Sequence, residues 1–291
     1  MNLKLRAYFL ISLLAISWGT IPLIIRTSDI SPLSLVGIRT FLGSIFLLLF
    51  VLKQRGITRK LFNSGFVLGP LLAIHWSTMF KSIELNSVAV GIGLVFSYPI
   101  FVILLEILRG QKVGRVQILI IFTGFFGLFF LLDISTIASP MGVLYGIISA
   151  ITLAILIIYG SEKSKEYGGL NVAFIQVIFA AVCLSPFTVS GFGWMLENLM
   201  VSLFLGFFLT GVGSHLLVCS KNYYTIVNWD NNLFGTSHGS DYWHFDFKRI
   251  IKRFSVFWLW FSYYCWNSSG LFRFQIDFRL KCFILVIVRT I

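Results

Sequence analysis

Charged residues are scarce in this sequence. Only 12% of its 291 residues are charged, whereas 57% are hydrophobic and the mean hydropathy is +0.90. A soluble domain carries about 25% charged residues, which it needs to cover a water-facing surface. The shortage therefore excludes a soluble enzyme, a disordered regulator and a nucleic-acid-binding domain. It indicates an all-α polytopic membrane protein.

Other sequence features that catalysis or cofactor binding would need are also missing. The four cysteines are scattered and form no CxxC pair, so neither a metal site nor a disulfide framework is indicated. No nucleotide-binding loop is present, and no carboxylate or histidine pair has catalytic spacing. We therefore expect no enzyme activity, cofactor or metal. The cysteines are Cys183, Cys219, Cys265 and Cys282.

Long apolar runs are abundant as far as Cys219. A hydrocarbon core about 30 Å thick needs roughly 20 apolar residues in a helix. The first run follows basic residues as a signal peptide does, but its length and the lack of a cleavage site predict a retained helix. The eight predicted spans are Ala7–Ile25, Pro32–Leu52, Leu61–Phe80, Val88–Leu108, Val116–Leu132, Met141–Tyr159, Asn171–Val189 and Asn198–Cys219.

Basic residues collect in alternate loops. Eleven lie before the first span or after the second, fourth and sixth spans, against two in the other loops. An excess of Lys and Arg marks the cytoplasmic side, so the N-terminus is predicted to be cytoplasmic. The eleven are Lys4, Arg6, Lys53, Arg55, Arg59, Lys60, Arg109, Lys112, Arg115, Lys163 and Lys165, and the two are Arg26 and Lys81.

The spans also repeat weakly. The segment Ile30–Leu48 is similar to Gly168–Phe187, which suggests a five-helix unit present twice. A repeat with an odd number of helices must insert in opposite orientations, as in many secondary transporters. We therefore expect a first repeat over residues 1–135 and the first three helices of a second repeat over residues 136–219.

The first 219 residues resemble the EamA-like branch of the drug/metabolite transporter superfamily. The similar pieces are SWGTIPLIIR, VGIRTFLGSIFLLL, AIHWSTMFKSIELNSVAVGIGLVFSYPIFVILLE and GRVQILIIFTGFFGLFFLL, in that order. The resemblance implies ten helices in two inverted repeats of five, which move small solutes by alternating access. It also implies a Glu-Pro pair in the ninth helix, equivalent to Tyr98-Pro99 in the fourth.

The last 72 residues break this pattern. Residues 220–291 contain no Ala, Pro, Met or Glu, yet they hold five of the eight tryptophans. Their best apolar stretch, Phe254–Trp266, is too short for a span. Read one nucleotide out of register, the codons of Leu233–His238 can spell Leu-Glu-Pro-Val-Met, and tryptophans become glycines. We therefore predict a frameshift near Ser214; the alternative is a genuine divergent cytoplasmic tail.

Six residues within the spans are candidates for a solute pathway. Polar side chains inside a bilayer are costly and are by default functional hypotheses. Helical rise places four of them roughly 6–11 Å from the outer ends of their spans, and the other two near mid-membrane. The four are Trp18, Arg39, His75 and Trp76, and the two are Tyr98 and Pro99.

Each candidate also has a structural interpretation. Arg39 could bind an anion such as a carboxylate, or it could bind helix-end carbonyls. His75 could titrate in a proton-coupled cycle, or donate a hydrogen bond between helices. The two tryptophans could line a pathway or fill space, and Pro99 could mark a hinge or an ordinary kink.

These observations favour a secondary transporter, working in the exporting direction, for a small metabolite or an amino-acid-like solute. Its partners would be a small-molecule substrate and the lipid bilayer of the cell membrane, with no nucleic acid. One alternative is a non-functional frameshifted product of such a gene. A second alternative is a structural or receptor-like membrane protein, although no extramembrane domain is visible in the sequence.

Overall fold

The fold is known from a computed structural model, which describes residues 13–14, 16–52, 56–111, 113–131 and 138–214. The predicted frameshift tail, residues 220–291, lies outside the described residues and stays a prediction. Residues 7–12 and 15 of the first predicted span also lie outside them, and the described remainder of that span is interrupted by a turn at Gly19 and Thr20 before a helix starts at Ile21.

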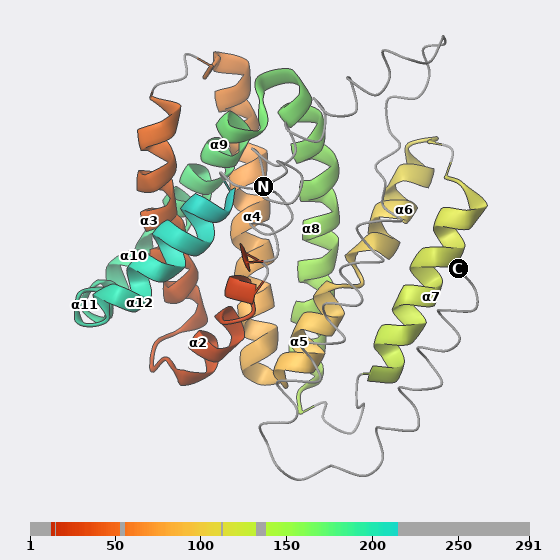
Figure 1. The fold of residues 1–291 in the computed structure, drawn as a ribbon, viewed down its shortest axis with the longest axis horizontal. Coiled ribbons are helices and arrows are strands. Elements are labelled where there is room, and N and C mark those ends of the chain that lie inside the picture. Colours follow the sequence, from red (N-terminus) through yellow and green to blue (C-terminus); the bar gives the residue numbers. More distant parts are fainter. Residues whose placement is uncertain (1–12, 15, 53–55, 112, 132–137, 215–291) are drawn as a thin grey trace, which may run out of the picture. The chain divides into compact units, whose positions relative to one another are not determined.

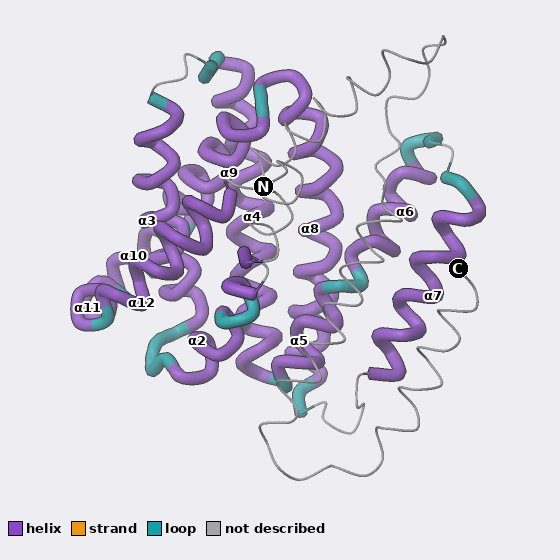
Figure 2. The backbone as a smooth tube through the Cα atoms, viewed as in Figure 1, coloured by secondary structure: helices purple, strands orange, loops and turns teal. Residues whose placement is uncertain are grey.

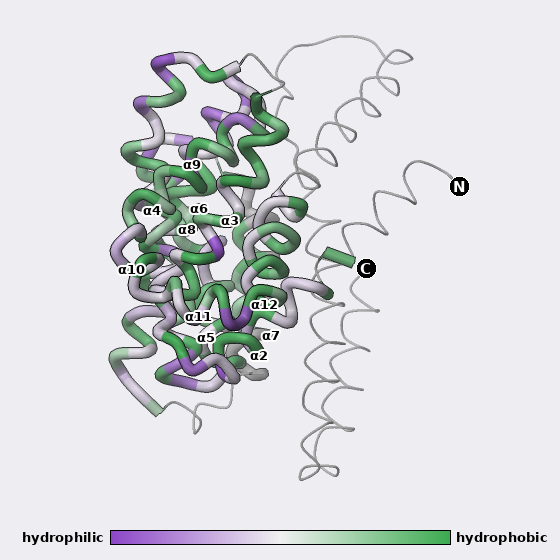
Figure 3. Tube along the Cα trace, turned by 90° about the vertical axis from the view of Figure 1, so that its left-hand side faces the viewer, coloured by the Kyte–Doolittle hydropathy of each residue, from purple (hydrophilic) through white to green (hydrophobic). Residues whose placement is uncertain are grey.

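All regular elements in the described ranges are helices, and these ranges contain no strand (Figures 1 and 2). Hydrophobic residues follow most of the helical trace, and hydrophilic ones gather mainly near helix ends (Figure 3). The predicted class, an all-α polytopic membrane protein, is confirmed. The elements are α2 (Ile21–Thr27), α3 (Pro32–Val51), α4 (Arg59–Leu85), α5 (Val88–Val95), α6 (Tyr98–Leu108), α7 (Arg115–Leu131), α8 (Pro140–Tyr167), α9 (Gly169–Cys183), α10 (Ser185–Ser190), α11 (Phe192–Glu197), α12 (Leu199–Leu203) and a π-helix, η2 (Phe204–Val212).

Hydroxyl side chains set the starts of the long helices. The side chains of Ser31, Thr58, Ser87 and Ser139 each accept a hydrogen bond from the backbone N–H three residues later, at the N-termini of α3, α4, α5 and α8. Such caps satisfy backbone donors that the helix itself leaves unpaired. The polar residue before each apolar run therefore fixes where the helix begins.

Four helical stretches are long and apolar enough to cross a membrane. They are Pro32–Val51, Arg59–Leu85, Val88–Leu108 (α5 and α6 together) and Pro140–Tyr167. α4 and α8 are longer than the spans predicted from the sequence, because hydropathy marks only the apolar part of a helix. A helix continues until a cap ends it, and α8 ends at Gly168, whose φ of 84° lies in the left-handed region.

Three other predicted spans are helical but shorter or divided. α7 has 17 residues. The predicted span Asn171–Val189 is divided at Leu184, and Pro186 lies in the first turn of the short helix α10 that follows. The predicted span Asn198–Cys219 becomes α12 and η2 as far as it is described. Proline lacks an N–H and removes one helical hydrogen bond, which favours a break before residue 186, although α4 continues through Pro70.

α4 lies against both α8 and α9, and α3 lies against α9 and η2 (Figure 1). Glycines permit these close approaches. A Cβ at Gly43 of α3 would lie 2.6 Å from Thr210 Cγ2 of η2, and one at Gly69 of α4 would collide with Phe179 of α9. In membranes, where lipid is as apolar as leucine, such close backbone packing is a main source of helix association.

Candidate solute site

A buried polar cluster joins α3, α4 and η2. Arg39 of α3 is only 4% exposed. Its guanidinium carbon lies 4.0 Å from the centre of the Trp76 ring of α4, and its Nε donates to Thr210 Oγ1 of η2 at 2.7 Å. The structure thus brings two predicted site residues, Arg39 and Trp76, into direct contact.

The π-helix η2 supplies the third side of this cluster. Thr210 Oγ1 accepts from Arg39 and itself donates to the Leu205 carbonyl oxygen, five residues earlier, at 2.9 Å. The indole Nε1 of Trp18 donates to the neighbouring Leu209 carbonyl oxygen at 3.1 Å. Short π-helical segments occur frequently at functional sites. Trp18 is therefore attached to the same turn of η2 that holds Arg39.

His75 precedes Trp76 on α4 and contacts α8. Its Nδ1 lies 3.0 Å from the Ser149 carbonyl oxygen and 2.9 Å from Ser149 Oγ. Since Ser149 Oγ donates to the His75 carbonyl oxygen at 3.0 Å, its one proton is used there, and Nδ1 acts as the donor. His75 thus makes an interhelical hydrogen bond; a role in proton coupling stays a prediction.

Tyr98 and Pro99 lie at a helix break. α5 ends at Val95 and α6 begins at Tyr98, with Ser97 Oγ donating to the Leu94 carbonyl oxygen at 2.6 Å. Pro99 has no N–H to continue the helical ladder, which explains the interruption. Within the described part of the chain, no hydrogen bond or ring contact joins these two residues to Arg39. The six candidates therefore do not form one contacting group.

Sequence reasoning missed Thr210 and Ser149. Both lie in apolar surroundings, and neither has a charge that would mark it as unusual in a span. The available signal was the spacing of Gly206 and Gly211 around Thr210, which permits close approach to α3. The sequence does not show which helix approaches Gly206 and Gly211, because that depends on how the helices pair.

The charge of Arg39 has little compensation among the described residues. Its Nη1 is buried without a hydrogen-bond partner, and the buried polar residues include no aspartate or glutamate. A cation–π contact contributes about 0.5–2 kcal/mol. The cost of an arginine at the centre of a span is about 2.5–3.5 kcal/mol even on the lower scales. The contact with Trp76 alone does not offset this.

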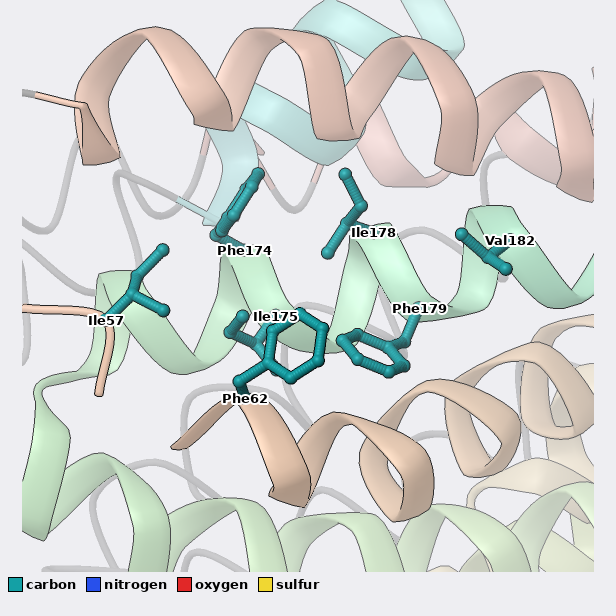
Figure 4. Close-up of a pocket in the computed structure, with 7 residues that line it drawn as sticks. All are labelled: Ile57, Phe62, Phe174, Ile175, Ile178, Phe179 and Val182. Atoms are coloured by element: carbon teal, nitrogen blue, oxygen red, sulfur yellow. The ribbon is translucent and has the colours of Figure 1, made fainter. Parts of the chain in front are cut away.

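An apolar groove lies between the start of α4 and α9. It has a volume of about 370 Å³ and is lined by the apolar side chains of Ile57, Phe62, Phe174, Ile175, Ile178, Phe179 and Val182 (Figure 4). Phe62 of α4 and Phe179 of α9 meet edge to face there, with ring centres 5.0 Å apart. This groove offers no donor or acceptor to orient a polar solute. Among the described residues, no group of three or more His, Cys, Asp or Glu could hold a metal ion.

Comparison with known proteins identifies the first part of the chain. The profile of the EamA-like transporter family matches residues 5–133. Residues 5–133 are therefore similar to this family, and we call them the EamA-like segment. The EamA-like segment includes Trp18, Arg39 and Trp76, whereas Thr210 lies beyond it. The resemblance inferred from the sequence is thus confirmed over residues 5–133, and the matched family is one of transporters.

One relative extends past the EamA-like segment. An "Uncharacterized transporter" of Archaeoglobus fulgidus is 25% identical over 177 residues, which cover 61% of this chain and 64% of that protein. The aligned region therefore spans about two thirds of the relative's length. No solved structure matches the chain.

Proposed function

We propose that this protein is a secondary transporter that exports a small metabolite or amino-acid-like solute across the cell membrane by alternating access. The apolar helices and the EamA-like segment support membrane transport. The excess of basic residues in alternate loops supports a cytoplasmic N-terminus. The proposed architecture is ten helices in two inverted repeats, residues 1–135 and the part that begins at residue 136.

The observation that carries the proposal is the buried cluster of Arg39, Trp76 and Thr210. A charged side chain inside a membrane protein typically faces the bundle interior and marks a substrate or ion pathway. Arg39 is buried, contacts two other elements and lies on a membrane-spanning helix.

The same cluster suggests how access could alternate. Arg39 belongs to the proposed first repeat and Thr210 to the second, so their hydrogen bond crosses between the repeats. Rocking of one repeat against the other would break this bond and expose the guanidinium. The interruption at Ser97, before Tyr98 and Pro99, is a candidate hinge for this motion.

A mixture of solutes tests the proposal while the transported compound is still unidentified. Vesicles containing the purified full chain, or its frame-corrected version, are loaded with a ¹³C-labelled metabolite extract, and the released compounds are measured by mass spectrometry. We expect one compound or a few related compounds to leave vesicles of the frame-corrected version faster than protein-free vesicles, and the uncorrected chain to release them more slowly or not at all. Trp76→Ala should reduce this release.

The matched control is Phe126→Ala, which truncates an aromatic residue that is 58% exposed on α7. Equal loss of release in both variants would show a general defect rather than a role for the cluster. If neither the full chain nor a frame-corrected version releases any compound, the transport proposal is wrong, and a structural or receptor-like role gains support.

A further inference from the structure

Arg39 has a hydrogen-bonding position that nothing in the described chain uses. One face of the guanidinium is covered by the Trp76 ring, and Nε is bonded to Thr210. Nη1 is fully buried, yet it has no partner. A buried donor without an acceptor is costly, so a group that fills this position would be bound strongly.

No described residue supplies an anion to balance the charge of Arg39. Thr210 Oγ1 is neutral and already donates to Leu205. The described carboxylates that form ion pairs, on Glu84, Glu106, Glu162 and Glu166, do so with surface lysines or with Arg109. No aspartate or glutamate is among the buried residues described.

We propose that Arg39 binds the carboxylate group of a monoanionic solute. This rests on the proposed transport function, since it names the substrate class of the same site. The N–H donors of a guanidinium lie in its plane and match the two oxygens of a planar carboxylate. Trp76 covers a face of the Arg39 guanidinium, so it does not block the edge that carries these donors.

Charge balance favours a monocarboxylate over a phosphate ester. A phosphate monoester carries a charge of about −1.5 to −2 at neutral pH. Arg39 is the only lysine or arginine among the buried residues that the structure describes. One guanidinium neutralises one carboxylate. The solute would reach Nη1 when η2 separates from α3.

The test compares two probes of the same shape. The full chain and its frame-corrected version are each purified in detergent. The temperature midpoint of unfolding is then measured at increasing concentrations of 4-methylpentanoate or 4-methylpentanamide, at equal chloride concentration. We expect the acid to bind about tenfold more tightly or better, because only the acid forms a charge-assisted pair. Inorganic phosphate is a third probe and should stabilise the protein less than the acid does.

Two variants test whether Arg39 causes the preference for the acid over the amide. Arg39→Gln should abolish the difference between acid and amide. Arg109→Gln should keep it, because Arg109 is 42% exposed and paired with Glu106. Equal binding of acid and amide, stronger binding of phosphate, or an unchanged preference in Arg39→Gln would overturn the inference. If Arg39→Gln does not fold, the comparison of probes in the unaltered chain still decides.

The transport proposal and the carboxylate-site proposal can be contradicted independently of each other. Acid-selective binding without release from vesicles would contradict transport while supporting the carboxylate site. Release of neutral compounds alone, with no acid preference, would contradict the carboxylate site while supporting transport.

Discussion

Two helix contacts in this structure, α3 with η2 and α4 with α9, contain different kinds of side chain. The contact between α3 and η2 encloses a guanidinium and a hydroxyl, and an indole hydrogen bond lies beside them. The groove between α4 and α9 is lined by apolar side chains alone. Both contacts contain a glycine at the closest approach, Gly43 in the first and Gly69 in the second.

This difference separates packing from function. Glycine-mediated approach occurs in both places, so close helix contact alone does not mark a site. Only the α3–η2 contact holds a buried charge, which costs stability unless something balances it. We therefore expect variants at the two contacts to differ in kind: loss of transport at one, loss of stability at the other.

The largest expected effect concerns the residues after position 214, which lie outside the two contacts compared above. A one-nucleotide correction near codon 214 should convert a poorly folded or inactive product into a ten-helix transporter. As written, Asp230 alone would cost about 2.5–3.5 kcal/mol at the centre of a span. The measurement is monodisperse yield in detergent for both versions. Equal yield together with transport by the uncorrected chain would make residues 220–291 a genuine tail.

Arg39→Ala should nearly abolish transport. Loss of one charge-assisted pair corresponds to about 1.5–3 kcal/mol, which is a reduction of about 10- to 100-fold. Membrane insertion should be unchanged or easier, because the variant removes a buried charge. Release from vesicles and membrane yield are measured in parallel. Arg26→Ala, at an exposed arginine of α2, is the control.

Gly69→Val should destabilise the α4–α9 contact by about 1–3 kcal/mol, since the added side chain collides with Phe179 and overpacks the contact. The readout is the unfolding midpoint in detergent. Gly193→Val provides the matched control because no atom lies within 4 Å of the position that a Cβ would take there. A midpoint equally lowered in the control would show that the effect is not specific to this contact.

Ser149→Ala should cost about 1 kcal/mol through the lost hydrogen bonds to His75. Transport should persist if His75 only joins α4 to α8, and its pH profile should stay the same. A changed pH dependence of release would instead favour the proton-coupling interpretation of His75.

Phe62→Ala should have the smallest effect, about 1 kcal/mol or less, and should leave transport unchanged. Phe62 is 47% exposed, and lipid replaces much of what the ring loses, so mainly its van der Waals contacts with Phe66 and Phe179 are removed. Unfolding and release are both measured. A large loss of transport would mean that the groove takes part in the solute pathway.

The sequence predicted the class and the longest membrane helices. These features depend on local properties: the length of an apolar run, the capping residue before it and the rise per residue. The ion pair of Glu106 with Arg109, three residues apart at the end of α6, is also local, at 3.3 Å. The break before α10 could have been foreseen from Pro186.

Only the tertiary structure decided what these residues contact. Thr210, 171 residues after Arg39, and Ser149, 74 after His75, became neighbours through the pairing of α3 with η2 and of α4 with α8. A hydropathy pattern gives the position of a helix along the chain but neither its rotation nor its neighbours. Because the spans are apolar on nearly every side, few polar positions remain to indicate which face turns inward. The sequence therefore determined that one charge, Arg39, lies within an apolar span, and the fold decided that it is buried against Trp76 with Nη1 unpaired among the described residues.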